Sequence, residues 1–382
     1  MTENLTVDFV SSISEVSAEE WDALFPIPYP FIRHAFFDAL ERGGSIGALS
    51  GWVPRYGLVY QRTQLIAAIP WFLKSHSYGE YFFDWAFAEA YERYNLDYYP
   101  KLVCAIPFTP SSGARLGLAA GWKAEQVLPT IEKKLDELAI AYGVSNCQCL
   151  YLEDDLKGEF IQRGWWQRDD VQFQWLNHDY SSFDDFLAQL TSRKRKQIRK
   201  ERHAVIAQGV EVRVLLGGEL DRQFWLEFAQ LYQLTYLKRS GHHGYLTPDS
   251  FMRLGEALAD SIMVTAAFCE QKMVAAALYF YSDNTLYGRY WGCQQEFDFL
   301  HFETCYYAGI EFCIERGLSF FDAGAQGEHK LKRGFEPIVR HGVYRFTESP
   351  LTPAIEGFCT RERQMLAQYR AQAEQQLPFR KS

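Results

Sequence analysis

The sequence predicts an α+β fold made of two similar halves, each a mostly antiparallel sheet flanked by helices. Three observations lead to this prediction. The chain has 382 residues, more than one hydrophobic core usually holds. Helical and strand-like patterns of apolar residues alternate along the chain. In each half, several strand-like runs are followed by a long helix and one more strand, which indicates a duplicated unit.

The first half begins with helices and continues with strands. Ser17 is a candidate N-cap for the first helix, and Gly43-Gly44 ends the second. Apolar side chains recur at helical spacing over 127–138, although Pro129 indicates a later helix start. The predicted elements are, in order, helices over 18–24 and 34–42, strands over 56–61, 65–73 and 101–106, a helix over 124–142 and a strand over 147–152.

The second half repeats this order after a polar segment near 177–182. Thr247-Pro248 begins a helix, and the turn residues Ser282, Asp283 and Asn284 join two strands. The predicted elements are, in order, helices over 183–208 and 222–237, a helix after Pro248, strands over 263–269, 273–281 and 285–292, a helix over 301–316, a strand over 319–322 and a helix over 353–376.

The order of elements also predicts topology. A strand that follows an antiparallel meander through a crossover helix must be added in parallel, and such a crossover is right-handed. This is the organisation of the GNAT acyltransferase fold, although other α+β sandwiches have it too. The duplication favours two tandem GNAT-like domains, at 1–178 and 179–350, with a C-terminal helix in 351–382.

Composition favours a globular cytoplasmic protein. Hydrophobic residues make up 48% of the chain and aromatic residues 16%, which suits deep pockets. Residues 1–10 contain no signal-peptide core, and the longest apolar run, 273–281, is too short to span a membrane. The net charge of −9 argues against a protein that coats nucleic acid, so any polyanion site must be local.

The eight cysteines contain no C-x-x-C pair and lie mostly in apolar stretches, which indicates buried thiols. Cys147 and Cys149 point to the same face of a predicted strand. A metal pair is the alternative there, but no histidine lies nearby in the sequence.

The first stretch that suggests chemistry is WFLKSHSYGEYFFDW, at 71–85. Its charged and imidazole side chains recur at even spacing, so on an extended chain they lie on one face. The surrounding rings favour a polar small-molecule pocket, and a solvated sheet face with an internal ion pair is the alternative. The residues predicted to bind substrate in this half are Lys74, His76, Tyr78, Glu80, Asp84 and Lys101.

The second stretch, TSRKRKQIRKERH at 191–203, holds seven Lys or Arg against one Glu. On a helix these residues form a cationic ridge that suits the phosphates of a coenzyme or of a tRNA. A solvated helix face is the alternative. The residues predicted to bind phosphate are Arg193, Lys196, Arg199, Lys200 and, from the third stretch, Arg333.

The third stretch, FDAGAQGEHKLKRGFEP at 321–337, follows a buried strand, and its glycines allow a tight loop. Glu328 and His329 are candidate general bases, and Lys332 offers positive charge for a phosphate or an oxyanion. A loop pinned by a Glu–Lys pair is the alternative. The residues predicted to bind substrate in this half are Trp291, His301, Glu303 and Gln326.

A metal site is a further alternative in the second half. His301 and Glu303 would form it with Glu328 and His329, but their spacing suits neither zinc nor a hard cation, so no metal is expected. The sequence contains no G-x-S-x-G, Walker, H-E-x-x-H or dinucleotide-binding motif, which argues against hydrolases and nucleotide motors.

Four long stretches together resemble one bacterial family. They are LKSHSYGEYFFDWAFAEAYER, YYPKLVCAIPFTPSSGARL, RYWGCQQEFDFLHFETCYYAGIEFCIERGL and FDAGAQGEHKLKRGFEP. They are similar to the Fem-like predicted N-acyltransferases, also labelled peptidoglycan biosynthesis or recognition proteins, over roughly residues 20–370. The resemblance implies a tandem GNAT-type fold, like that of Fem-type peptidyltransferases and leucyl/phenylalanyl-tRNA–protein transferases.

Those relatives move an aminoacyl group from tRNA to an amine and carry a Phe-Lys-x-Gly-Phe-Gly-like turn. Here Lys332, Gly334 and Phe335 are in register with that turn, whereas Leu331 replaces its aromatic residue and Glu336 its last glycine. The GNAT coenzyme loop is missing from GCQQEFDFLHFE. The donor therefore stays open between aminoacyl-tRNA and acyl-CoA.

The sequence thus suggests an N-acyltransferase in which the amine of a small molecule or a peptide attacks the acyl donor directly. Glu328, His329 and Lys332 are the predicted catalytic residues. The alternative function is a non-catalytic module that binds a cell-wall precursor or nucleic acid. The sequence leaves the oligomeric state open.

Overall fold

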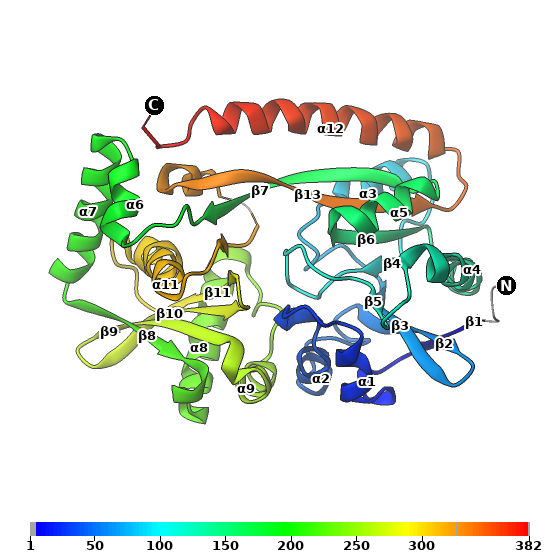
Figure 1. Ribbon diagram of the computed structural model, residues 1–382, viewed down its shortest axis with the longest axis horizontal. Helices are drawn as coiled ribbons and strands as arrows, with labels where there is room; N and C mark the ends of the chain where they lie inside the picture. The colour runs from blue at the N-terminus through cyan, green and yellow to red at the C-terminus, as the bar shows by residue number, and fades with distance from the viewer. Residues whose placement is uncertain (1–4, 326, 381–382) are drawn as a thin grey trace. The chain divides into compact units, whose positions relative to one another are not determined.

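The computed structural model describes residues 5–325 and 327–380 (Figure 1). The chain forms two compact units, unit 1 with residues 1–170 and 339–368 and unit 2 with residues 171–338 and 369–382. The predicted domains are continuous segments, whereas these units are not. The reason is that β7 (Trp166–Leu176), β13 (Phe335–Phe346) and α12 (Thr352–Glu374) each contribute residues to both units.

Unit 1 contains the predicted meander and crossover. Strands β2, β3 and β4 pair antiparallel, and β6 joins β4 in parallel after helix α4. The strand order is β1-β2-β3-β4-β6-β13, and β5 pairs with β3. The remaining bounds are β1 Leu5–Val10, β2 Trp52–Gln61, β3 Gln64–Lys74, β4 Lys101–Cys104, β5 Gly117–Leu118 and β6 Asn146–Leu152.

Helix α4 spans Ala124–Tyr142, so the expected later start at Pro129 is wrong. Proline lacks the N–H that would bond the carbonyl of Glu125 one turn earlier. Arg163 Nη2 donates to that carbonyl at 3.1 Å, which explains how the helix tolerates the proline. The other helical elements of this unit are η1 Ile13–Glu15, α1 Ala18–Ala23, η2 Pro30–Ile32, α2 His34–Arg42, α3 Trp85–Arg93 and α5 Asp154–Gln162.

Unit 2 repeats the arrangement. Strands β9, β10 and β11 pair antiparallel, and β12 joins β11 in parallel after the crossover helix. The strand order is β7-β12-β11-β10-β9-β8. The bounds are β8 Val210–Leu216, β9 Ile262–Cys269, β10 Lys272–Tyr281, β11 Thr285–Cys293 and β12 Phe320–Asp322.

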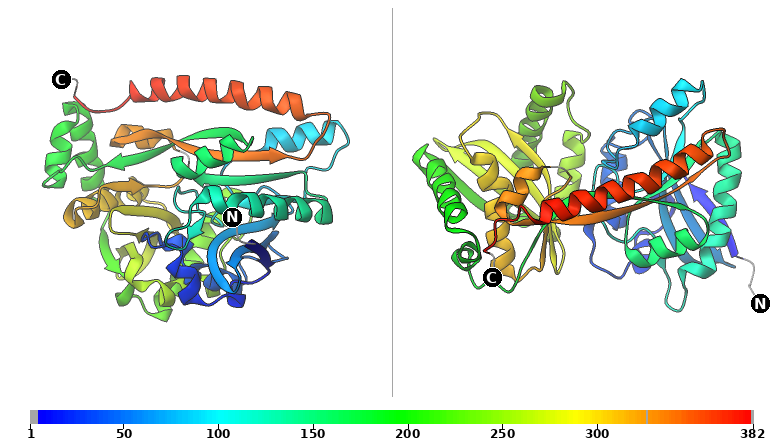
Figure 2. Two further views of the ribbon diagram at one scale, coloured as in Figure 1. Left: turned by 45° about the vertical axis from the view of Figure 1, so that its right-hand side comes forward. Right: turned by 90° about the horizontal axis from the view of Figure 1, so that it is seen from above.

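The helix predicted over 183–208 is two helices. The chain breaks between them at Leu190 and Thr191, where Leu190 forms a β-bridge with Phe379 and Thr191 N donates to the carbonyl of Pro378 at 2.9 Å. The segment after α12 therefore turns back to this break (Figure 2). The bounds are α6 Phe183–Gln189, α7 Ser192–Ala207, η3 Gly217–Glu219, α8 Arg222–Ser240, α9 Pro248–Ala257, η4 Ala259–Ser261 and η6 Glu328–Arg333.

The crossover helix of unit 2 is irregular. It consists of α10 (Leu300–Phe302), a π-helical turn η5 (Glu303–Tyr307) and α11 (Ala308–Arg316). Single π-turns inside helices are rare, and those that occur are often found at functional sites. The crossover packs on a core that includes Ile310 and Phe312.

Strand β11 also departs from regular geometry. Leu278 of β10 pairs with Tyr290 and Tyr279 pairs with Gly288, so Arg289 is the extra residue of a β-bulge. A bulge shifts the alternation of side chains by one position. After the bulge, each side chain at the end of β11 therefore points to the face of the sheet opposite to the one it would have in a regular strand.

No helix within residues 5–325 and 327–380 is both long enough and apolar enough to cross a bilayer. The longest helix, α12, is close to its predicted range and runs unbroken in Figure 2.

Candidate functional site

The loop after β12 is held in place by buried charged side chains that bond its backbone. Asp322 at the end of β12 forms an ion pair with Arg289 at 3.3 Å and accepts a hydrogen bond from Gly324 N at 2.9 Å. Lys330 Nζ donates to the carbonyls of Ala323 at 3.0 Å and Gly324 at 2.7 Å. These contacts fix the backbone that leads into η6.

His329 of η6 lies among rings and cations. Its Nε2 is 2.8 Å from the hydroxyl of Tyr306 in the π-helical turn. A Cβ on Gly327 would lie 2.7 Å from the ring of His329, so this position, with φ of +102°, requires glycine. His329 as a whole is exposed, like its neighbour Glu328. The burial of part of its ring, together with Lys330, Arg333 and Lys332, lowers the pKa of His329 to about 4. The imidazole is therefore neutral at pH 7 and keeps one free lone pair, although the low pKa makes it a weaker base than an unperturbed histidine.

His301 is a second neutral imidazole beside it, with ring centres 6.3 Å apart. Burial, with Arg239 as the largest charge effect, lowers the pKa of His301 to about 3. The ring centre of Trp291, which follows the bulge at Arg289, is 5.4 Å from that of His301. The two imidazoles and the indole form one cluster.

A cavity of about 250 Å³ adjoins this cluster. It lies between the end of α8, the end of β11 and the start of the crossover helix. Lys238 and Arg239 supply positive charge, and Glu296 supplies one negative charge. The lining residues are Thr235, Lys238, Arg239, Trp291, Cys293, Glu296, Phe297, Leu300 and His301.

The structure brings together only part of the residues predicted in this half. Trp291 and His301 line the cavity, whereas His329 does not line it but has its ring centre 6.3 Å from that of His301. Glu303 instead binds Arg202, with its Oε1 2.8 Å from Nη2. Gln326 lies outside the described residues.

The other two predicted catalytic residues point elsewhere. Both Glu328 and Lys332 are exposed. Glu328 accepts a hydrogen bond from the hydroxyl of Tyr369 at 2.9 Å. Lys332 lies near Lys194 of α7, whose pKa is lowered by burial and then by Lys332 and its other cationic neighbours.

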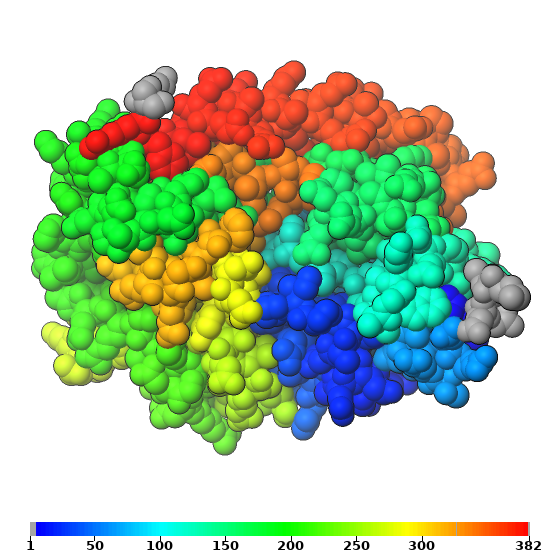
Figure 3. Space-filling model, in the orientation of Figure 1, coloured from blue at the N-terminus to red at the C-terminus, as the bar shows by residue number. Residues whose placement is uncertain are grey.

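The predicted phosphate-binding residues do not form one site, because four are exposed on α7 and one is buried. Arg193, Lys196, Arg199 and Lys200 are exposed on α7, and Arg199 forms an ion pair with Asp184 at 2.7 Å. Residues 183–207, bright green, form part of the surface in Figure 3. Arg333 is buried and bonded to protein groups, so its guanidinium faces the interior rather than a phosphate in solvent.

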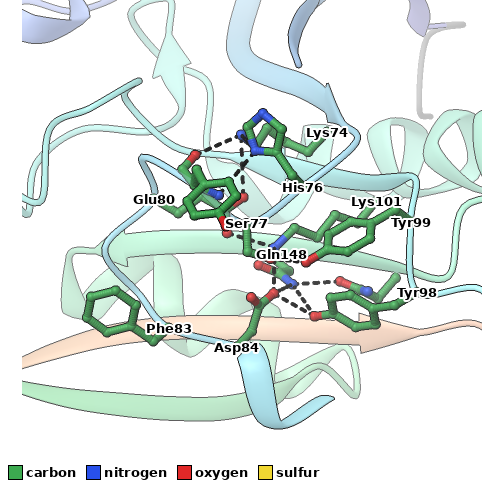
Figure 4. A network of polar contacts seen from close by, with 12 residues as sticks. Lys74, His76, Ser77, Glu80, Phe83, Asp84, Tyr98, Tyr99, Lys101 and Gln148 are labelled. Atoms are coloured by element: carbon green, nitrogen blue, oxygen red, sulfur yellow. Dashed lines mark hydrogen bonds and ion pairs between the residues drawn. The ribbon is translucent and has the colours of Figure 1, made fainter. Parts of the chain in front are cut away.

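Several of the predicted binding residues of unit 1 lie close together, but the even spacing along the sequence is not what brings them together. Residues 75–84 form bends and turns rather than an extended strand, so even spacing does not explain their positions. Lys74 and Lys101 are paired across β3 and β4, and the loop returns Glu80 and Asp84 to the same place (Figure 4). Lys101 Nζ lies 2.8 Å from Ser77 Oγ, 2.7 Å from Glu80 Oε2 and 2.5 Å from Asp84 Oδ2.

These groups are buried and bonded to one another. Burial lowers the pKa of Lys74 to about 7 and raises that of Glu80 to about 7. For Asp84 burial acts in the opposite sense, but Lys101 and the neighbouring hydroxyl donors outweigh it and lower the pKa to about 2. His76 accepts a hydrogen bond from Tyr78 N at 3.1 Å, and Lys74 donates one to the carbonyl of Tyr78 at 3.0 Å.

The described residues contain no group of three or more His, Cys, Asp or Glu side chains placed to hold a metal. The proposed ligands Glu303 and Glu328 bind Arg202 and Tyr369, as described above. Burial raises the pKa of Cys147 to about 12, so with no metal bound this thiol is protonated at pH 7.

Sequence reasoning missed Lys238, Arg239 and Tyr306. A basic pair just before Ser240-Gly241 is typical of an ordinary helix end, where cations favour the helix dipole. Tyr306 stands in an apolar run that predicts a core position. Neither the basic pair nor the apolar run distinguishes a functional residue from one with a purely structural role.

The sequence matches the model of the FemAB-like family, described as peptidoglycan biosynthesis/recognition, over residues 12–381. No curated protein matches the sequence. Among solved structures, FemX matches with a TM-score of 0.53 at 14% identity, over 89% of this chain and 98% of its own.

Two further structures are similar. A conserved protein of unknown function from Bacteroides thetaiotaomicron has a TM-score of 0.52 at 12% identity, over 90% of this chain and 100% of its own. The C-terminal domain (DUF2156) of a putative lysylphosphatidylglycerol synthetase from Agrobacterium fabrum has a TM-score of 0.51 at 10% identity, over 93% of this chain and 98% of its own. At such identities the likeness shows the fold alone, and it confirms the predicted tandem GNAT-like α+β fold. The chain belongs to the FemAB-like family of peptidoglycan biosynthesis and recognition proteins.

Proposed function

We propose that the protein is an N-acyltransferase that moves an acyl or aminoacyl group from acyl-CoA or aminoacyl-tRNA to an amine. Membership of the FemAB-like family is consistent with this activity. The observation that carries the proposal is the neutral imidazole of His329, held by Tyr306 beside a cavity that Lys238 and Arg239 line.

In the proposed reaction the amine nitrogen attacks the carbonyl carbon of the donor. The C–N bond forms, the C–S or C–O bond of the donor breaks, and the nitrogen loses one proton. With Nε2–H donated to the Tyr306 oxygen, Nδ1 of His329 has the lone pair that accepts this proton. Lys238 and Arg239 bind the donor phosphates, since their charges meet in one cavity. The leaving thiolate of the coenzyme or alkoxide of the tRNA ribose takes a proton from solvent or from the imidazolium.

Glu328 and Lys332 stay predictions as catalytic residues, and the residues of unit 1 as acceptor-binding residues. Glu328→Gln and Lys332→Gln test the first pair directly. A loss of transfer in either variant that matches the loss in His329→Gln supports a role in the reaction.

The test is transfer of a labelled acyl group by the full-length protein. Acyl-CoA and charged tRNA are each offered with a panel of small amines and peptides. We expect His329→Gln to lower kcat by about a hundredfold, the usual range for a general base, and Arg239→Gln to raise the KM of the donor about tenfold. The control is Lys272→Gln, at an exposed lysine that begins β10. Binding of a cell-wall peptide or RNA without turnover, unaffected by His329→Gln, would favour the non-catalytic module.

A further inference from the structure

Arg333 is the most completely bonded charge near the proposed base. Its side chain is buried, and its three nitrogens all donate. Nε lies 2.9 Å from the hydroxyl of Tyr307, Nη2 3.0 Å from Glu201 Oε2, and Nη1 3.0 Å from the carbonyl oxygen of His329. The guanidinium carbon is 3.4 Å from the centre of the Phe302 ring.

Glu201, Tyr307 and Arg333 form a closed triad, called the clamp below. The Tyr307 hydroxyl also donates to Glu201 Oε2, so each member bonds the other two. The three residues come from α7, the π-helical turn and η6. The clamp therefore ties the turn that carries His329 to two neighbouring helices.

The π-helical turn holds His329 at two points. Tyr306 contacts its imidazole, and the next residue, Tyr307, contacts Arg333, which bonds its backbone carbonyl. Successive residues of a helix point in different directions, so two neighbouring tyrosines approach η6 from two sides. The π-turn, whose closing bond runs from Ala308 N to the carbonyl of Glu303, sets these directions.

We propose that the clamp is a positioning device that fixes the backbone of His329 and thereby the place of its ring beside the cavity. This proposal rests on the proposed function for its catalytic meaning. It also assigns Arg333 a role different from phosphate binding. Arg333 does not touch a reacting atom, so it is a positioning residue.

The choice of arginine fits this role. A guanidinium offers donors in a planar fork that matches three acceptors at once, whereas a lysine ammonium is a compact charge on a flexible stem. A lysine at 333 keeps the charge but leaves at least one of the three acceptors without its bond. Arg333→Lys therefore separates charge from geometry.

The experiment uses the full-length protein with Arg333→Lys and the milder Tyr307→Phe. If transfer is found, we expect kcat to fall tenfold to about a hundredfold, as for a small displacement of a catalytic group, while KM changes less than about twofold. Independently of activity, the His329 ring resonance, assigned by its loss in His329→Gln, is expected to shift in both variants. Amide hydrogen exchange over 328–333 is expected to quicken about tenfold or more.

The matched control is Arg168→Lys in unit 1. Arg168 is also buried, bonded to Glu362 through Nε at 2.7 Å and to the Tyr344 hydroxyl through Nη1 at 3.2 Å. This variant is expected to lower the melting temperature without moving the His329 resonance.

The proposal is overturned if Tyr307→Phe and Arg333→Lys destabilise the protein like Arg168→Lys but leave the His329 resonance and the exchange over 328–333 unchanged. If the wild-type protein transfers no acyl group, the proposed function fails, yet the resonance and exchange measurements still decide whether the clamp positions His329.

Discussion

Lys74 and Lys101 are direct cross-strand partners on β3 and β4, so two fully buried lysines lie next to each other on one face of a sheet. Like charges in this position destabilise a sheet. The loop after β3 compensates by bringing Glu80 and Asp84 to the same place, with ion pairs from Lys101 to both. The stability of unit 1 therefore depends on this balance of charges.

Lys101→Met tests the balance. It leaves the Asp84 carboxylate buried without its cation, and removal of one partner from a buried ion pair costs about 3–5 kcal/mol of unfolding free energy. Urea unfolding followed by circular dichroism measures the loss. The control is Lys134→Met, which removes an exposed pair with Glu137 at 2.7 Å and is expected to cause no measurable change. Equal effects of the two variants would contradict the prediction.

The pH dependence of stability tests Glu80. Burial raises the pKa of Glu80 in the folded protein to about 7, from 4.5. Between these pH values the folded state binds more protons than the unfolded state, so the free energy of unfolding falls as pH rises. The slope from one such group is at most about 1.4 kcal/mol per pH unit.

A glutamine at position 80 does not titrate, so the free energy of unfolding of Glu80→Gln is not expected to fall in this pH range for this reason. The difference in unfolding free energy between Glu80→Gln and wild type should grow in favour of the variant from pH 4.5 to about 7 and then level off. Glu125→Gln, at an exposed position of α4, is the control. A difference that does not depend on pH in this window would rule the explanation out.

Much of the fold could be predicted because its elements have strong local signals. Helix α4 has apolar residues at helical spacing and matches its predicted range, and β9, β10 and β11 are apolar runs bounded by turn residues. Strand β13, which contributes residues to both units, was not predicted. β13 contains Pro337 and several charges, so its sequence does not read as a strand. The break between α6 and α7 depends on a β-bridge to Phe379, which no local pattern reveals.

The candidate site was predicted only where glycine and charge occur together in one short stretch. That signal led to the η6 loop and to His329, whose catalytic role stays a prediction. It misplaced Arg333, because an arginine in a basic turn reads as a phosphate ligand until its buried partners Glu201 and Tyr307 are known. Lys74 and Lys101 meet through sheet register, which spacing along one strand cannot reveal.

Gly292→Ala tests the packing beneath the cavity. A Cβ at this position would lie 2.5 Å from the backbone nitrogen of Tyr232, and the backbone of α8 cannot move aside easily. We expect a loss of about 1–3 kcal/mol of unfolding free energy, as for overpacked cores, measured by urea unfolding. Gly218→Ala is the matched control, because a Cβ there meets no atom within 4 Å. A stable Gly292→Ala protein would show that α8 shifts readily.

The exposed cations of α7 distinguish the two donor classes. If aminoacyl-tRNA is the donor, Lys196→Gln with Lys200→Gln should reduce the slope of log affinity against log salt concentration by about two, since each lysine would neutralise one phosphate. Filter binding of tRNA over a salt series measures the slope. Lys123→Gln with Lys133→Gln, in exposed positions of unit 1, is the charge-matched control. The same slope in both double variants would remove α7 as a tRNA-binding surface.

The division of unit 1 between two distant parts of the chain affects its synthesis. β13 pairs with β6, but the ribosome makes residues 339–346 long after β6 has left the exit tunnel. One edge of β6 therefore stays uncovered while residues 153–340 are made, and unpaired strand edges are where nascent chains associate wrongly. Unit 1, whose synthesis begins first, is therefore completed only when residue 368 has been made. A gene truncated after codon 178 would encode most of unit 1 without the strand that covers this edge.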